Sequence, residues 1–256
     1  MGVPGLVDIQ SGVTRFLPNL PTNWRDIEAG SILGDKIGAP VRLLNDVRTA
    51  TLGELTYGHG AKFGTMAFFS LGTGIGGGFV MNGEIHHGAS DAAGEFGHMT
   101  IDSTGRKCKC GNYGCLEAYA SGPNIAARAV EGIEAGVESL LVELVDGELD
   151  RITAATVYEG VVRDDPYAHE VMKETAKFLG VGVANLINAL NPDAVVIAGG
   201  VTRAGEHLFA PLRKEVRRRA FRSAVDACRI VPAALPETAG VIGAAGIFKN
   251  QTYGSV

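Results

Sequence analysis

Short apolar runs, several of which stop at glycine, divide this chain into predicted strands. Such runs are typical of buried strands, and they lie at 41–44, 65–72, 77–83 and 194–200. The second and third runs flank a glycine turn, which predicts an arrangement like a hairpin.

Other segments carry apolar residues at helical spacing. They lie at 123–136, 153–162, 166–190 and 204–221. A further helix is predicted at 45–55, with Asn45 or Asp46 near its N-cap, and a helix of small residues at 237–250.

Strands and helices mixed along the whole length predict an α/β architecture. The 256 residues are 46% hydrophobic, which suits one large domain or two smaller ones. The sequence has neither a stretch of about 18 uninterrupted apolar residues nor a basic and then apolar N-terminus, so we expect no membrane span, no secretory signal and a cytoplasmic protein.

The net charge of -5 gives no general attraction for nucleic acid, so a bound phosphate must be held by local groups. Six of the ten residues at 213–222 are basic, but apolar residues recur among them at helical spacing. We favour a solvated helix face there over a nucleic-acid patch.

The most specific signal is a cluster of metal-ligating residue types. His98, Cys108, Cys110 and Cys115 fall within 18 residues, with glycines between them, whereas Cys228 is far away. Because thiols stay reduced in a chain without secretory features, a metal explains the cluster better than a disulfide. We interpret it as a structural zinc site with four protein ligands, with an empty cluster as the alternative.

Polar residues near these motifs are candidate substrate ligands. Asn45 and Asp46 follow the first predicted strand, Glu95 precedes His98 by three residues, and Glu117 follows Cys115 by two. Each carboxylate has a simpler interpretation: Asp46 caps its helix, Glu95 orients His98, and Glu117 is a surface charge.

The stretch "SLGTGIGGGFV" at 70–80 contains five glycines. A tight turn that needs positive φ explains two of them more readily than five. We therefore expect a ligand to approach this backbone closely.

Taken together, these motifs resemble the ROK family (repressors, open reading frames and sugar kinases), and within it the bacterial glucokinases. The resemblance is carried by "GVPGLVD", "LLNDVRTATLGE", "LGTGIGGG", "GASDAAGEFGH", "CKCGNYGCLEAYASG", "VVIAGGV" and "AGVIGAAGI". It implies an α/β fold of the actin and hexokinase type (ribonuclease H-like), with two domains and a cleft between them. The small domain would comprise 1–62 with the C-terminal helix 239–256, and the large domain 63–238 with the zinc loop 98–115.

The resemblance also implies residue roles in the phosphorylation of a hexose, glucose first among them, by ATP with Mg²⁺. Asp46 matches the catalytic base, and Asn45, Glu95, His98 and Glu117 match sugar ligands. Gly72, Thr73 and Gly74 match a phosphate-binding hairpin, and Gly199 and Gly200 would lie beside the adenosine. His98 would serve both zinc and sugar.

Kinases of this family carry a first phosphate hairpin, an Asp-x-Gly-Gly-Thr turn, ahead of "GVPGLVD", and these 256 residues contain no such turn. The resemblance thus implies a small domain truncated at its N-terminus and a chain that phosphorylates poorly or not at all. Two other functions stay open: the sugar-sensing core of a ROK repressor and, less favoured, a zinc-ribbon interaction module. The family resemblance implies a homodimer.

Overall fold

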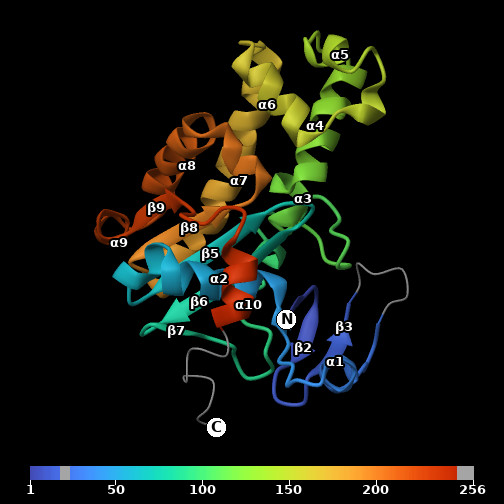
Figure 1. Ribbon diagram of the computed structural model, residues 1–256. Helices are drawn as coiled ribbons and strands as arrows, with labels where there is room; N and C mark the ends of the chain where they lie inside the picture. The colour runs from blue at the N-terminus through green and yellow to red at the C-terminus, as the bar shows by residue number, and fades with distance from the viewer. Residues whose placement is uncertain (18–23, 247–256) are drawn as a thin grey trace. The chain divides into compact units, whose positions relative to one another are not determined.

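The computed structural model describes residues 1–17 and 24–246 (Figure 1). It contains two compact units. Unit 1 consists of Met1–Phe68, Gly77–Glu95 and the described residues from Ala233 on, and unit 2 of Phe69–Gly76 and Phe96–Pro232. The domain limits stay a prediction. The units differ from them in that residues 63–68, 77–95 and 233–238 group with unit 1.

Nine strands are present in the described residues. They are β1 (Gly2–Val3), β2 (Leu6–Asp8), β3 (Val13–Phe16), β4 (Leu44–Asn45), β5 (Met66–Leu71), β6 (Ile75–Met81), β7 (Glu84–Ile85), β8 (Ala194–Ala198) and β9 (Arg229–Pro232). β1 pairs with β4 in parallel, β2 pairs with β3 antiparallel, and the other five form one sheet in the order β7-β6-β5-β8-β9.

Ten α-helices connect these strands within the described ranges. They are α1 (Ala29–Ile37), α2 (Asp46–Tyr57), α3 (Glu117–Ala120), α4 (Gly122–Glu134), α5 (Leu141–Leu144), α6 (Ala154–Val162), α7 (Pro166–Leu190), α8 (Glu206–Arg219), α9 (Arg222–Ala227) and α10 (Ala239–Gly246). Short 3-10 helices lie at His59–Lys62, Phe96–His98, Leu149–Arg151 and Gly200–Ala204. The predicted α/β architecture is confirmed.

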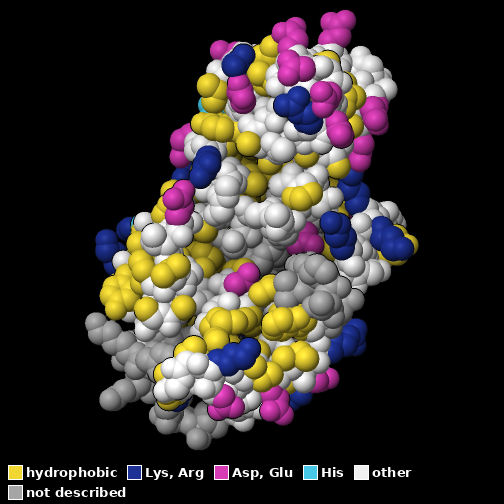
Figure 2. All heavy atoms as spheres, turned by 45° about the vertical axis from the view of Figure 1, so that its right-hand side comes forward, with side chains coloured by type: hydrophobic (Ala, Val, Ile, Leu, Met, Phe, Trp, Pro, Cys, Tyr) yellow, Lys and Arg dark blue, Asp and Glu magenta, His cyan; other side chains and the backbone are white. Residues whose placement is uncertain are grey.

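In unit 2, strand β8 is buried at all five positions, as in sheets that are covered on both faces. It pairs in parallel with β9, with Ala194 opposite Arg229. Helices α7 and α8 pack against one another, while α4, α5 and α6 gather at one end of the unit (Figure 1). Asp and Glu side chains crowd the surface of that end (Figure 2), so it is no place for a nucleotide's phosphates.

Local signals in the sequence explain why α7 has its observed limits. The Asp165 side chain accepts a hydrogen bond from the Ala168 amide, and Pro166 occupies the first turn, where its missing N–H costs nothing. At the other end Asn191 adopts a left-handed conformation with φ 44°, and Pro192 follows it. The predicted helices 123–136, 153–162 and 166–190 are confirmed as α4, α6 and α7.

The predicted strand at 41–44 is wrong for most of its length. Only Leu44 and Asn45 form β4, because the parallel register sets Leu44 opposite Gly2. Residues 41–43 therefore find no strand partner in the part of the chain that the structure describes. Leu43 is nevertheless fully buried, which accounts for the apolar pattern.

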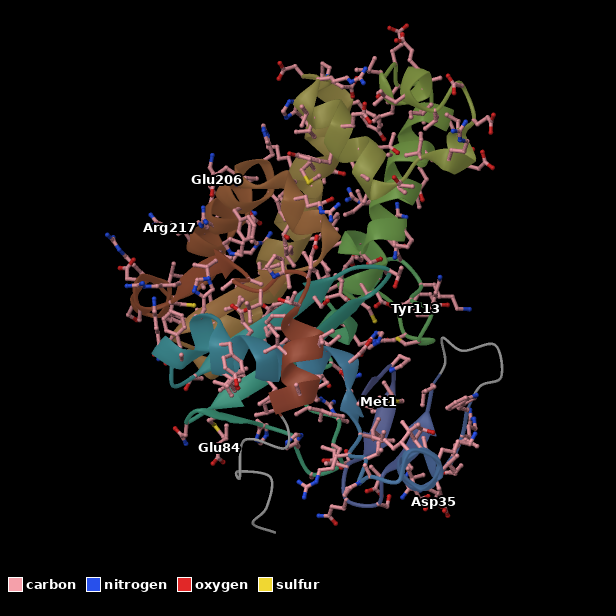
Figure 3. The ribbon with its side chains drawn as sticks, in the orientation of Figure 1. Met1, Asp35, Glu84, Tyr113, Glu206 and Arg217 are labelled. Carbon is pink, nitrogen blue, oxygen red and sulfur yellow. The ribbon has the colours of Figure 1, made fainter. Side chains whose placement is uncertain are left out.

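The basic stretch at 213–222 begins in the second half of α8 and runs past its end, and the interpretation as a solvated helix face is confirmed. Leu212 and Val216 are buried, while Arg217 points outward on the same side as Glu206 (Figure 3). Neighbouring acids balance part of the charge, since Arg218 and Arg219 both pair with Glu215. The predicted helix extended to 221, but α8 ends at Arg219, and Phe221 is 77% exposed.

The predicted C-terminal helix at 237–250 is confirmed for the part that lies within the described residues. α10 covers Ala239–Gly246, and residues 247–256 lie outside the described residues. None of the helices in the described ranges is both long and apolar enough to span a membrane.

Helices α2 and α10 of unit 1 pack so closely that glycine is required between them. A Cβ on Gly243 would lie 1.8 Å from the Thr49 carbonyl oxygen, whereas a Cβ on Gly240 of the same helix would meet nothing within 4 Å. These two glycines are a matched pair for testing the packing.

We expect Gly243→Ala to lower the free energy of unfolding by about 1–3 kcal/mol, because the helices must separate to admit the methyl group. Gly240→Ala should be neutral or stabilising by up to about 1 kcal/mol, because alanine is the better helix former. Denaturant unfolding of both variants measures the difference, and equal stabilities would contradict the packing argument.

Candidate functional site

The four predicted metal ligands lie together in unit 2. The ligand atoms of His98, Cys108, Cys110 and Cys115 are all within 4.8 Å of one another. The Cys110 and Cys115 sulfurs are 3.7 Å apart, and the Cys108 sulfur is 3.8 Å from His98 Nδ1. Ligands around tetrahedral zinc are separated by about 3.8 Å, given a Zn–S bond of about 2.3 Å, so these donors fit such an ion.

The loop that carries the thiols is held by its own main chain and by Tyr119. The Cys108 amide donates to the Asn112 carbonyl at 2.8 Å, and the Gly111 amide donates to the Cys108 carbonyl at 3.0 Å. The Tyr119 hydroxyl accepts from the Arg106 amide and donates to Asp102. Tyr113 lies exposed on this loop (Figure 3).

Two of the three thiols in the cluster, those of Cys108 and Cys115, are buried. Burial raises the pKa of the Cys115 thiol to about 12, and burial also raises the pKa of Cys108. Without a metal these thiols stay protonated at neutral pH, so an ion that binds must displace their protons. Cys228 is not part of the cluster.

Glu117 connects the cysteine loop with the glycine hairpin. Its Oε2 accepts a hydrogen bond from the Ile75 amide at 2.8 Å, and its Oε1 is 3.9 Å from the Cys108 sulfur. A Cβ on Gly74 would lie 2.5 Å from Oε2, so glycine is needed for the hairpin to meet this carboxylate. The sequence interpretation of Glu117 as a surface charge is therefore wrong.

The predicted phosphate and adenosine residues come together at the ends of β5 and β8. The Gly72 amide donates to the Gly74 carbonyl at 2.9 Å, which closes the turn, and Gly72 and Thr73 are exposed. Gly199 has φ 99°, and a Cβ there would lie 2.1 Å from the Leu71 carbonyl oxygen, so its main chain packs directly on the end of β5. Space around Gly72 and Gly200 is open, since a Cβ on either would meet nothing within 4 Å.

In unit 1, Asn45 and Asp46 lie at the start of α2. Asn45 Oδ1 accepts from the Val47 and Arg48 amides at 3.0 and 3.1 Å, and its Nδ2 donates to the Gly5 carbonyl at 3.1 Å. Such a cap contributes about 1 kcal/mol and fixes the helix start. Asp46 is exposed in the first turn, and Asn45 is thus the N-cap, which decides between the two candidates.

Desolvation by the surrounding protein raises the pKa of the Asp46 carboxyl above its ordinary value, although the side chain itself reaches solvent. The Val47 amide, which donates to Oδ1 at 2.9 Å, opposes this shift without cancelling it. A carboxylate with a raised pKa is a better proton acceptor than an ordinary aspartate.

Glu95 lies on the loop that follows β7, and its side chain is 45% exposed. Its Oε1 is 3.5 Å from the Arg48 guanidinium. Sequence reasoning missed Arg48, which is 1% exposed. The only available signal would have been an arginine at a position of α2 that faces the core. The apolar pattern of 45–55 is too weak to distinguish such an arginine from one on the surface.

Asn45, Asp46 and Glu95 thus belong to unit 1, and His98, Glu117, Gly72, Thr73, Gly74, Gly199 and Gly200 belong to unit 2. Within unit 2 the structure joins the metal cluster, Glu117 and the hairpin into one bonded arrangement. Within unit 1 it joins the start of α2 to the Glu95 loop.

Comparison with known proteins agrees with this arrangement. The ROK family model matches residues 1–251. The glucokinase of Halalkalibacterium halodurans is 38% identical over 252 residues, which are 98% of this chain and 76% of the relative. A putative xylose repressor of a Caldicellulosiruptor species is 34% identical over 244 residues, which are 95% of this chain and 60% of that protein.

Among solved structures, a ROK family glucokinase from Streptomyces griseus in complex with glucose and AMPPNP matches with a TM-score of 0.85 and 32% identity. The match covers 96% of this chain and 79% of that one. The fold is therefore the α/β fold of actin and the hexokinases, with a histidine and three cysteines gathered beside a glycine hairpin. The chain belongs to the ROK family, and it is a sugar kinase or a ROK regulator.

We expect purified protein to contain about one zinc ion per chain, because the four donors leave no ligand position empty. Cys110→Ser should lose the metal, while Cys228→Ser should keep it and serves as the control. Elemental analysis after dialysis measures the ratio, and wild-type protein without stoichiometric metal would refute the site.

We expect Glu117→Ala to speed hydrogen exchange of the Ile75 amide by about 10- to 100-fold, because a hydrogen bond to a charged group contributes about 1.5–3 kcal/mol. Glu117→Gln keeps an acceptor and should retain most of the protection. Glu134→Ala, an exposed change on α4, is the control. Equal exchange in all variants would show that Glu117 does not hold the hairpin.

Proposed function

We propose that this protein transfers the terminal phosphoryl group of ATP to a hexose, with glucose as the first candidate. The observation that supports it most is the hairpin at 72–75 beside Gly199 and Gly200, with open space around Gly72 and Gly200. A protein that only senses sugar has no need of a phosphate cradle. The 38% identity to a glucokinase over nearly the whole chain favours the same function.

Asp46 would be the general base. A sugar hydroxyl is a poor nucleophile, and a carboxylate that accepts its proton as the phosphoryl group arrives supplies what the reaction needs. The cap made by Asn45 fixes Asp46 at the start of a rigid helix, and desolvation raises its pKa toward the working range of a base.

Asn45, Glu95, His98 and Glu117 would bind the sugar hydroxyls. The amide of Asn45 has one N–H left after its bond to Gly5. His98 turns Nδ1 toward the thiols, which leaves Nε2 for a hydroxyl. A zinc ion on the four donors would be structural and would fix that ring.

The amides around Gly72, Thr73 and Gly74 would meet the nucleotide's phosphates, which a protein of net charge -5 must hold by local dipoles. Gly199 and Gly200 would lie beside the adenosine. Mg²⁺ bound with the nucleotide supplies charge neutralisation. We propose a homodimer on the family resemblance alone.

A second candidate function is the sugar-sensing core of a ROK transcriptional regulator. The 34% identity to a putative xylose repressor favours it. The DNA immediately upstream of the codon for Met1 distinguishes the two: an Asp-x-Gly-Gly-Thr turn encoded there indicates a kinase, and a helix-turn-helix indicates a regulator.

The proposed function is tested by a coupled assay over a panel of hexoses and N-acetylhexosamines, with ATP or polyphosphate as donor. Turnover is measured on the protein as its gene encodes it, and sugar binding on these 256 residues by calorimetry. Phosphorylation of glucose above the other sugars supports the proposal. Binding of sugar to the whole gene product with no turnover would favour the regulator.

We expect Asp46→Asn to keep sugar affinity within about threefold while lowering kcat by about 10²- to 10⁴-fold, because only the proton acceptor is lost. In the wild type the acidic limb of the kcat/KM profile should lie above the ordinary aspartate pKa, since the raised pKa keeps Asp46 protonated, and inactive as a base, to a higher pH. A variant with near wild-type turnover would refute the assignment.

A further inference from the structure

Arg48 places a buried positive charge beside the loop that carries Glu95. It lies in the first turns of α2, two residues after Asp46, and its side chain is only 1% exposed. Nε donates to the Ala93 carbonyl at 3.0 Å, Nη1 donates to the Asp91 carbonyl, and Nη2 is 3.5 Å from Glu95 Oε1. All these residues belong to unit 1.

The three acceptors are spread over five residues of one loop. An arginine fork is planar and rigid, so it can satisfy them together only while residues 91–95 keep one conformation relative to α2. A buried guanidinium that lost these acceptors would retain its desolvation cost, which makes other loop conformations unfavourable.

The same loop is also fixed by main-chain packing. Gly94 has φ 97°, and a Cβ there would lie 2.8 Å from the Gly77 carbonyl oxygen. The Ala93 amide also donates to the His87 carbonyl at 3.0 Å. The loop is thus held both by β6, at Gly94, and by the Arg48 guanidinium.

We propose that Arg48 is a positioning residue that fixes the carboxylate of Glu95 relative to Asp46, and that it thereby determines sugar affinity. This inference rests on the proposed function, in which Glu95 binds the sugar and Asp46 accepts its proton. The guanidinium is near Oε1 of Glu95, which leaves Oε2 as the oxygen for a sugar hydroxyl. Arg48 and Asp46 lie in the same turn of α2. The contacts of the Arg48 guanidinium therefore fix the Glu95 loop relative to Asp46.

The test uses Arg48→Met, which keeps most of the side-chain volume, and Arg48→Lys, which keeps the charge but not the planar fork. Lys36→Met, on the exposed face of α1 in the same unit, removes a positive charge elsewhere and is the control. Hydrogen exchange of residues 86–95 and the calorimetric affinity for glucose are measured on each variant well below its Tm.

We expect Arg48→Met to raise the exchange rate in residues 91–95 and to weaken glucose binding by about 10- to 100-fold, because a misplaced binding group loses most of its contribution. Arg48→Lys should fall between Arg48→Met and the wild type, and Lys36→Met should match the wild type. In the protein as its gene encodes it, KM for glucose should rise more than kcat falls, and KM for ATP should stay within about threefold.

A double-mutant cycle separates positioning from general stability. If Arg48 acts through Glu95, then Arg48→Met should cost little affinity in a Glu95→Ala background, so that the two effects are strongly non-additive. Additive effects, unchanged exchange in 91–95, or an unchanged glucose affinity in folded Arg48→Met and Arg48→Lys would each overturn the inference. Should Arg48→Met fail to fold, Arg48→Lys alone carries the same comparison.

Failure of the proposed function gives a different result. A wild-type protein that binds none of the hexoses overturns the sugar-binding role, and with it the claim about affinity. The exchange measurement needs no sugar, so it still decides whether Arg48 holds the loop. Wild-type sugar binding with no effect of Arg48 overturns the inference alone.

Discussion

The hydrogen bond from the Ile75 amide to the Glu117 carboxylate is the contact on which the arrangement of unit 2 depends. A hairpin rich in glycine has little intrinsic preference for one conformation, and it must be fixed from outside. Glu117 does this from the first residue of α3, two positions after Cys115, and the Gly122 amide adds a second bond to the Gly72 carbonyl. The stiffness of the hairpin therefore depends on the segment that carries Cys115 and Glu117. A metal that orders this segment would stabilise the hairpin without touching a phosphate.

Unit 1 solves a similar problem by a different means. There the loop before Glu95 is fixed by a buried cation and not by a carboxylate, and the helix that carries this cation begins with the candidate base. The Asn45 side chain caps the helix through Oδ1, and its Nδ2 donates to the Gly5 carbonyl. The cap, the base and the cation follow one another within four residues, so small movements of α2 would displace all three together.

Much of this could be predicted from the sequence, because its long helices have caps and its metal ligands are close in the chain. Apolar residues at helical spacing over 166–190 predicted α7, and the spacing of His98 and the cysteines predicted the cluster. β1 to β4 were largely missed, since strands of two to four residues are too short to show a period. The glycine run at 70–80 predicts a close approach to its backbone, but the sequence of this segment does not show which distant residues make that approach. Gly72 is open, Gly74 meets Glu117, and Gly78 lies against Thr51.

Cys115, Glu117 and Gly122 lie close together in the sequence. Their spacing affects which segments can be exchanged between relatives in a chimaera. Metal ligand, hairpin support and helix start are encoded in eight consecutive positions, 115–122, while their partners Gly72, Gly74 and Ile75 are encoded some forty residues earlier. A chimaera that exchanges 98–122 with the segment of a relative would pair a foreign carboxylate with the native hairpin. Segments 70–76 and 98–122 are joined by the Ile75–Glu117 and Gly122–Gly72 hydrogen bonds, so a graft that exchanges both segments together keeps these contacts.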